Sequence, residues 1–506
     1  MDRTERISLH ELPPSDARHE PVVGGVDDDG TPTTPDAADA RQAEANMKRT
    51  LVLLGASLSQ LPIWGFSMSY GVFQEYYVNH WTLGGSRAAA GVIGTTSNGV
   101  LYLAMPLLFA AFTRRWAARR REAAVAGAVL AAASLALSSL ATHAAHLVAT
   151  QGVLAALGCA LVYSPTTLSL SEWFSGAGGG GRNRRRAVAY GVTLSCKNVV
   201  GSVVPFLARA LLENLGFRVA VRVWAAVVLV TSLLSIALIP THPSVLAAAA
   251  AAPAGEEEEE AARRRRRAIP WHFLGHRTFY VYALAIALQS AGYGIPQSYL
   301  PTYAREVARL SQTSATLLLT VFNVPGILAS SLFGYLSDRG GDNNNNSSNG
   351  NRRLLPSWSS SATTATAVSA ASSALAALLL WGLAARGGLA QLLVFSATFG
   401  FFAGGYSATW GGVVSELEGE AARRNEAVDP GMLYGLLNGA RGVGYVAGGL
   451  ASVPLLRAGG GGGGAPLGAS GYASAYGPLI LFTGLSSAFG GWGILWKWAA
   501  RIRRLS

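Results

Sequence analysis

Two basic residues lie within long apolar stretches of the sequence, where a charged side chain needs a specific reason. Lys197 lies in the apolar run from Ala187 to Leu212, and Arg441 lies in the glycine-rich run LNGARGVGYVAGG. At 1.5 Å per residue, Lys197 is roughly 15 Å from the start of its run, near the centre of a ~30 Å hydrocarbon layer. A lysine there costs about 2.5 kcal/mol or more, so it should face a cavity or a partner rather than lipid. We expect both residues to bind an anion, with a structural pairing or a brace between helices as the alternative.

An arginine and a lysine bind anions in complementary ways. The guanidinium group can clamp a carboxylate with two hydrogen bonds, and the ammonium group acts as a point charge. The two residues come from opposite halves of the chain, so they could face one central cavity from two sides. No Asp or Glu lies in the middle of an apolar run, so a built-in carboxylate proton relay has little support. If a proton is the coupling ion, it would travel on the substrate or on Lys197.

Several polar residues in the apolar runs are further candidates for lining such a cavity. For each of them the alternative is a hydrogen bond between neighbouring helices. These candidates are Tyr70, Gln74, Asn198, Tyr293, Asn323 and Asn438.

Composition places the chain among integral membrane proteins. Half of the 506 residues are hydrophobic and only 13% are charged, against roughly 25% in soluble domains. The formal net charge of +12 does not indicate a nucleic-acid partner, because the arginines cluster in short runs between apolar segments. Both cysteines lie inside apolar segments, which excludes a disulfide framework, and we expect no metal site. We find no nucleophile with a base and no phosphate loop, so neither an enzyme nor a cofactor is expected.

Twelve apolar runs are long enough to span a bilayer, and they form two groups of six. The sequence therefore predicts an all-α integral membrane protein with twelve transmembrane helices in two six-helix bundles. The runs fall at about 51–77, 88–112, 123–142, 146–170, 187–212 and 218–240, and then at about 278–300, 313–336, 360–383, 388–414, 432–456 and 474–498.

This pattern divides the chain into five parts. We expect a disordered cytoplasmic tail over 1–49, a first bundle over 50–240, a cytoplasmic loop over 241–277, a second bundle over 278–498 and a short cytoplasmic tail over 499–506. The central loop carries glutamates at 256–260 and arginines at 263–267. Its expected role is a tether with the arginines near anionic membrane lipid, and a regulatory docking site is the alternative.

The distribution of basic residues predicts the orientation. If the runs alternate in direction, the arginine clusters at 119–121, 184–186, 263–267 and 423–424 all fall on one side, together with both termini. By the positive-inside rule, both termini are cytoplasmic. The expected host is the plasma membrane, with a vacuolar or other internal membrane as the alternative. Arg209 and Arg222 lie nearer the outer ends of their runs and are expected to extend to the membrane surface.

One local motif lies at the cytoplasmic end of the eighth run. It reads Gly334-Tyr335-Leu336-Ser337-Asp338-Arg339-Gly340-Gly341. It resembles the G-x-x-x-D-R-x-G motif of the major facilitator superfamily. The resemblance implies that Gly334 allows close helix contact. It also implies that Asp338 and Arg339 lock neighbouring helices at the cytoplasmic face in one state of a transport cycle.

A second pattern extends the resemblance. The first run contains Trp64-Gly65-Phe66 and then YGVFQEYY at 70–77, and the region from Gly158 to Arg218 contains Tyr163, Pro165, Trp173-Phe174, Arg185-Arg186-Ala187, Gly201 and Pro205. These residues resemble the monocarboxylate-porter family, and its fungal members in particular. The resemblance implies a two-bundle fold and secondary transport of small organic solutes, often a monocarboxylate in symport with a proton.

The sequence thus predicts a transporter that moves a small organic solute, in particular an organic anion, by alternating access. Lys197 and Arg441 would bind the charge of the solute, and Asp338 with Arg339 would stabilise the outward-open state. Two alternatives remain. One is an exporter of a metabolite within the same fold, and the other is a non-transporting membrane receptor or nutrient sensor.

Overall fold

The structure is a computed structural model, and it describes residues 35–80, 84, 89–113, 116–174, 182–243, 271–338, 362–384, 388–426, 428–459 and 470–502. The chain divides into two compact units, Met1–Lys48 and Arg49–Ser506. The described part of the first unit belongs to α1 (Pro35–Leu58), so part of the segment expected to be disordered is helical. The glutamate and arginine runs of the central loop, for which the sequence predicts a tether, lie outside the described residues.

Long helices make up the second unit. Its first half contains the end of α1, α2 (Gln60–Asn79), α3 (Ala89–Thr113), α4 (Arg120–Ser138), α5 (Ala144–Leu147), a π-helical turn (Val148–Leu154), α6 (Ala155–Phe174) and α7 (Arg182–Leu238). Its second half contains α10 (Arg277–Glu306), α11 (Gln312–Asp338), α12 (Ala362–Leu375), a π-helical turn (Ala376–Trp381), α13 (Leu389–Tyr406), α14 (Trp410–Arg423), α15 (Pro430–Gly459), α16 (Gly477–Phe489) and α17 (Gly493–Ile502).

The helices account for the twelve predicted crossings. Among the described residues, nine helical segments are long and apolar enough to cross a membrane. One of them, within α7, contains two crossings because the chain turns at Gly216, whose φ of 72° favours glycine. The helices α10 and α15 have 30 residues each, and this length also suffices to cross the hydrocarbon layer.

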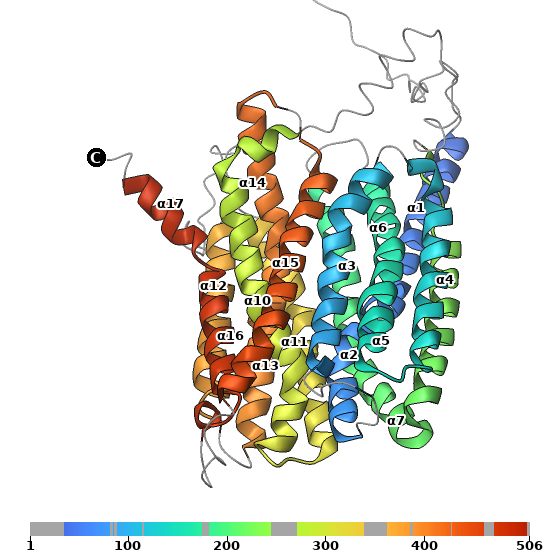
Figure 1. The fold of residues 1–506 in the computed structure, drawn as a ribbon. Helices are drawn as coiled ribbons and strands as arrows, with labels where there is room; N and C mark the ends of the chain where they lie inside the picture. Colours follow the sequence, from blue (N-terminus) through green and yellow to red (C-terminus); the bar gives the residue numbers. More distant parts are fainter. Residues whose placement is uncertain are drawn as a thin grey trace, which may run out of the picture. The chain divides into compact units, whose positions relative to one another are not determined.

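The two halves of the second unit meet mainly along three pairs of helices. In Figure 1 the helices from α2 to α7, blue to green, lie on one side, and those from α10 to α16, yellow-green to red, lie on the other. Contacts between the halves join α3 to α15, α7 to α11 and α2 to α10. Gly442 of α15 lies so close to α3 that an added Cβ would be 2.6 Å from the backbone nitrogen of Leu103. Small residues at this interface therefore allow the halves to pack closely.

The second unit has two chemically different ends. The end that carries the arginines at 119–121 and 423–424 and the helix α17 is called the basic end here, and it is the upper end in Figure 1. The opposite end, called the distal end, contains the turn at Gly216, the end of α2 and the connection from α10 to α11. Between the ends, large apolar side chains point outward, such as Leu107 with 75% of its surface exposed. Such a surface suits contact with lipid.

Candidate functional site

Lys197 lies on α7 and contacts two aromatic residues of the same half. Its Nζ atom is 3.8 Å from the centroid of the Trp64 ring on α2. The same atom donates a hydrogen bond to the Tyr102 hydroxyl on α3 at 3.3 Å. A cation held over an aromatic face is attracted by the negative face of the ring. Lys197 is therefore held by two neutral aromatic partners.

Arg441 lies on α15, in the second half, and is only 5% exposed. Its Cζ atom is 5.1 Å from the ring centroid of Tyr102, 5.3 Å from that of Tyr293, 5.5 Å from that of Trp410 and 5.6 Å from that of Tyr445. Its Nη2 atom donates a hydrogen bond to the Tyr445 hydroxyl at 3.5 Å. Its Nε atom is buried and has no hydrogen-bond partner among the described residues. A buried donor without a partner is costly, and such groups need an explanation.

Tyr102 joins the two cations into one site. It accepts the hydrogen bond of Lys197, and its ring lies near Arg441 and stacks on Tyr445 with 5.6 Å between ring centroids. We call the following set the central cation site: Lys197, Arg441, Trp64, Tyr102, Tyr293, Trp410 and Tyr445.

Among the described residues, the two cations of the central cation site have no negatively charged partner. Within the part of the chain that the structure describes, the ion pairs join carboxylates to other basic residues, and none includes Lys197 or Arg441. No group of His, Cys, Asp or Glu among these residues is placed to hold a metal ion. The arrangement suits an anionic ligand that brings its own negative charge.

The other predicted site residues fall into different places. Tyr293 belongs to the central cation site through its contact with Arg441. Asn198 and Asn323 connect the halves instead. Asn198 donates a hydrogen bond to the Ser330 hydroxyl on α11 at 3.3 Å, and Asn323 donates one to the Gly201 carbonyl on α7 at 3.1 Å.

Three further predicted residues form no hydrogen bond with Lys197 or Arg441 among the described residues. Tyr70 donates a hydrogen bond to the carbonyl of Ala90, within its own half. Asn438 donates one to the carbonyl of Tyr434, one turn earlier in α15. Gln74 is buried on α2, and its Oε1 atom has no hydrogen-bond partner among the described residues.

The predicted gating motif lies at the end of α11. Gly334 is within this helix, Asp338 is its last residue, and Arg339 lies outside the described residues. The hydroxyl of Ser337 donates a hydrogen bond to the carbonyl of Thr409 at 2.8 Å. The end of α11 is therefore attached to the short helical turn that precedes α14.

Sequence reasoning identified Tyr293 but missed the other four aromatic residues of the central cation site, and it misjudged one arginine. Trp410 and Tyr445 flank Arg441 from apolar runs in which a single aromatic residue carries no distinctive signal. The expectation that Arg209 extends to the membrane surface is wrong. Arg209 is only 6% exposed, and its Nη2 atom is 3.1 Å from a carboxylate oxygen of Glu75. A usable signal was present in the sequence, because Glu75 and Arg209 both lie near the ends of apolar runs that reach the distal end and could therefore pair there.

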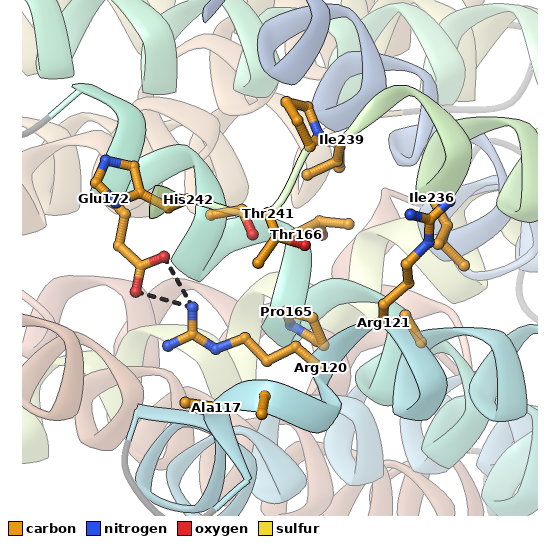
Figure 2. Close-up of a pocket in the computed structure, with 14 residues that line it drawn as sticks. Ala117, Arg120, Arg121, Pro165, Thr166, Glu172, Ile236, Ile239, Thr241 and His242 are labelled. Carbon is orange, nitrogen blue, oxygen red and sulfur yellow. Dashed lines mark hydrogen bonds and ion pairs between the residues drawn. The ribbon is translucent and has the colours of Figure 1, made fainter. Parts of the chain in front are cut away.

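A cavity of about 60 Å³ lies at the basic end of the first half. Figure 2 shows that Arg120 and Glu172, which line it, face one another and are joined by dashed lines. Both carboxylate oxygens of Glu172 are 2.8 Å from Nη1 of Arg120. Because the two charges neutralise one another and the volume suits only a few water molecules, this cavity is a poor solute site.

A smaller cavity of about 20 Å³ lies between the halves and closer to the central cation site. Tyr163 and Tyr190 line it from the first half, and Tyr434 lines it from the second. Tyr163 also packs edge-on against Trp64 with 5.8 Å between ring centroids.

The basic end of the second half carries a separate cluster of charge. The His276 ring nitrogens lie 3.1 Å from a carboxylate oxygen of Glu420 and 2.7 Å from one of Glu426. The hydrogen bond to His276 lowers the pKa of the Glu426 carboxyl. This cluster connects the start of α10 to the end of α14 and the segment that follows it.

The fold and this site together define a polytopic membrane protein with two helical halves and a cation-lined centre. The family model of the Major Facilitator Superfamily matches residues 52–449, so the chain belongs to the Major Facilitator Superfamily.

Relatives among characterised proteins are named as transporters. The chain is 25% identical to the MFS-type transporter pynF of Aspergillus niger over 58% of this chain and 62% of that protein. It is 23% identical to monocarboxylate transporter 10 of Danio rerio over 57% of this chain and 54% of the relative. It is 26% identical to the Fujikurins efflux protein of Gibberella fujikuroi over 56% of this chain and 55% of the relative. These alignments therefore span a little over half of each relative.

Proposed function

We propose that this chain is a secondary transporter that moves a small organic anion across a membrane by alternating access between its two halves. One observation carries the proposal. Two cations, one from each half, meet at Tyr102: Lys197 donates a hydrogen bond to its hydroxyl and Arg441 lies against its ring. Among the described residues, no carboxylate forms an ion pair with either cation. An intramembrane ionisable residue without such a partner indicates a substrate or ion pathway.

The chemistry of the central cation site supports an organic acid as the solute. Arg441 can offer its unpartnered Nε and a neighbouring N–H group to both oxygens of one carboxylate. Lys197 adds a second positive charge, and the surrounding rings provide apolar contact for the carbon skeleton of the solute. Monocarboxylates are the first solutes to test, because relatives of this chain are named monocarboxylate transporters. A proton is the candidate coupling ion.

The proposal includes an orientation. The arginine clusters of the basic end support a cytoplasmic location for that end, and the plasma membrane is the proposed host. Gly334, Asp338 and Arg339 are the proposed gating motif at this end. We assign Asn198 and Asn323 to the interface beside the solute path, and Tyr70, Gln74 and Asn438 to its more distant walls.

Counterflow in proteoliposomes tests the proposal. Vesicles loaded with a panel of monocarboxylates, aromatic acids and neutral vitamins are compared for wild type, Lys197→Ala and Arg441→Ala. We expect wild type to exchange at least one anion and both variants to lose that exchange. Arg222→Ala is the matched control, because Arg222 is an exposed arginine on α7 that bonds only to Ser139 in the described hydrogen bonds. Exchange of neutral solutes alone, unchanged by either central substitution, would contradict the proposal.

Export of a metabolite is a second candidate for the direction of transport. It is favoured by the similarity to a protein named for efflux of fujikurins. Uptake measured separately in inside-out and right-side-out vesicles distinguishes the two directions. A strong preference for loading into inside-out vesicles would support export.

A further inference from the structure

A second cluster of buried charge lies at the distal end, where the proposed solute site does not extend. Glu75 is on α2 near this end and is only 2% exposed. One of its carboxylate oxygens is 3.1 Å from Nη2 of Arg209 on α7. The other is 3.6 Å from Nε of Arg305 on α10. A buried carboxylate between two arginines is costly to assemble and unlike a solvated surface pair.

Each of the two arginines has a further partner at the distal end. Arg209 donates a hydrogen bond from Nε to the Thr316 hydroxyl on α11, and its Nη1 atom is 3.1 Å from a carboxylate oxygen of Glu213. Arg305 donates from Nη1 to the carbonyl of Leu310 at 2.9 Å. With two carboxylates and two guanidinium groups, the cluster is electrically balanced by the chain itself.

The cluster crosses the boundary between the halves twice. Glu75 and Arg209 belong to the first half, whereas Arg305 and Thr316 belong to the second. The ion pair of Glu75 with Arg305 and the hydrogen bond of Arg209 with Thr316 therefore both join one half to the other. Glu213, by contrast, pairs with Arg209 four residues earlier in the same helix.

We propose that Glu75, Arg209, Arg305 and Thr316 form a gate, called the distal lock here, that closes the solute path at the distal end. The two crossing interactions must break when the halves separate there, and they re-form when the distal end closes. The inference rests on the proposed transport function, but it does not depend on the identity of the solute or on Lys197 and Arg441.

Charge solvation makes such a lock reversible. Closing it removes Glu75, Arg209 and Thr316 from water, leaves Arg305 partly exposed, and replaces the lost hydration with the ion pairs and the hydrogen bond. Opening admits water to the same groups, so the closed and open states can differ by only a small free energy. A transporter needs such a small difference, because a minor state must remain accessible during the cycle.

Distances between spin labels test the distal lock in the full-length protein without any solute. Labels are attached at His80→Cys, at the end of α2, and at Thr313→Cys, at the start of α11, in a background with Cys159→Ser and Cys196→Ser. Both labelled positions are exposed and lie in opposite halves at the distal end. Pulsed electron paramagnetic resonance then gives the distribution of distances between the halves at this end.

We expect Glu75→Gln and Arg305→Gln each to raise the ratio of long-distance to short-distance molecules about tenfold. Glu213→Gln is the matched control. It removes a carboxylate from the same arginine without touching the boundary between the halves, so the distribution should stay as in the parent. If Glu75→Gln does not yield folded protein, Arg305→Gln decides alone, because Arg305 is more exposed.

Two outcomes would overturn the inference. One is an unchanged distribution in monodisperse Arg305→Gln and, where it folds, in Glu75→Gln. The other is an equal opening in Glu213→Gln. Failure of the anion proposal would be a separate result, because it would show as unaltered counterflow in Lys197→Ala and Arg441→Ala and would leave these distances unaffected.

Discussion

The central cation site and the distal lock place the same kind of side chain in two different electrical situations. At the distal end, two guanidinium groups face the buried carboxylate of Glu75, and Arg209 has Glu213 as well. At the centre, Lys197 and Arg441 contact aromatic rings and a tyrosine hydroxyl, without a carboxylate among the described residues.

The presence or absence of a neighbouring carboxylate distinguishes two roles for positively charged side chains in this protein. Where the chain supplies its own anion, the charges connect elements of the protein to one another. Where no carboxylate of the described residues pairs with the cations, our proposal is that an external anion supplies the negative charge. The comparison therefore predicts that removing a charge from the distal lock affects stability and conformation, whereas removing one from the central site affects transport.

The largest effect is expected from Arg441→Ala. Losing two charge-assisted hydrogen bonds to a carboxylate, each contributing about 1.5 to 3 kcal/mol, should reduce anion exchange at least about a hundredfold. The melting temperature should stay unchanged or rise, because a buried charge with an unpartnered Nε is removed. Counterflow and thermal unfolding in detergent check the two parts. A large fall in melting temperature with exchange preserved would reverse the roles assigned to the two regions.

Glu75→Gln should have the next largest effect, and on stability. The substitution leaves Arg209 and Arg305 facing a neutral amide in a buried place, so the free energy of unfolding should fall by about 3 kcal/mol. Glu213→Gln, at a carboxylate that is 47% exposed, should cost under about 1 kcal/mol. Thermal unfolding of the two variants side by side gives the contrast. Equal losses would mean that burial does not distinguish the two carboxylates.

Lys197→Met should have a smaller effect than Arg441→Ala. Lys197 acts as a point charge rather than a bidentate clamp, so we expect a loss of about 1.4 kcal/mol, or tenfold, in the apparent affinity for the anion. Lys197→Arg retains the charge and should recover much of this loss. Concentration dependence of counterflow measures both. A tenfold loss in Lys197→Arg as well would indicate that Lys197 has a role other than its charge.

The smallest effect is expected at the basic end, where Glu426 lies near His276. The pKa of Glu426 is lowered below the unfolded value of 4.5, so its contribution to stability is complete above that pH. The contribution is lost as the pH falls through the lowered folded-state pKa. Glu426→Gln should therefore make the melting temperature less dependent on pH below about 4.5. If the melting temperature of Glu426→Gln depends on acidic pH as strongly as that of wild type, Glu426 does not contribute to acid stability.

The fold could be predicted from the sequence because the hydrocarbon layer of a membrane requires each spanning segment to be apolar and about 20 residues long. Twelve apolar runs, the turn near Gly216 and the two halves could all be recognised from composition and spacing. The two central cations could also be singled out, because a charge in an apolar run is conspicuous. Their meeting at Tyr102 depends on how α3, α7 and α15 cross, which no local pattern encodes.

The other residues whose position differs from the prediction also owe that position to tertiary contacts. Asn198 and Asn323 are as polar as any residue of a cavity, yet their hydrogen bonds join α7 to α11. Arg209 lies near a helix end, and sequence position alone suggested an extension toward water. Its burial depends on Glu75, which lies 134 residues away along the chain. Such pairings are visible only when helices that are distant in the sequence are placed together.

The contact between Lys197 and Trp64 also gives the protein an optical property. The ammonium group lies 3.8 Å from the centroid of the Trp64 ring, within range of strong electrostatic influence on the indole. An anion that draws this ammonium away changes the electric field at that ring, and the emission of Trp64 changes with it. The difference in fluorescence between wild type and Trp64→Phe can then follow occupancy of the central site directly, before any solute has crossed the membrane.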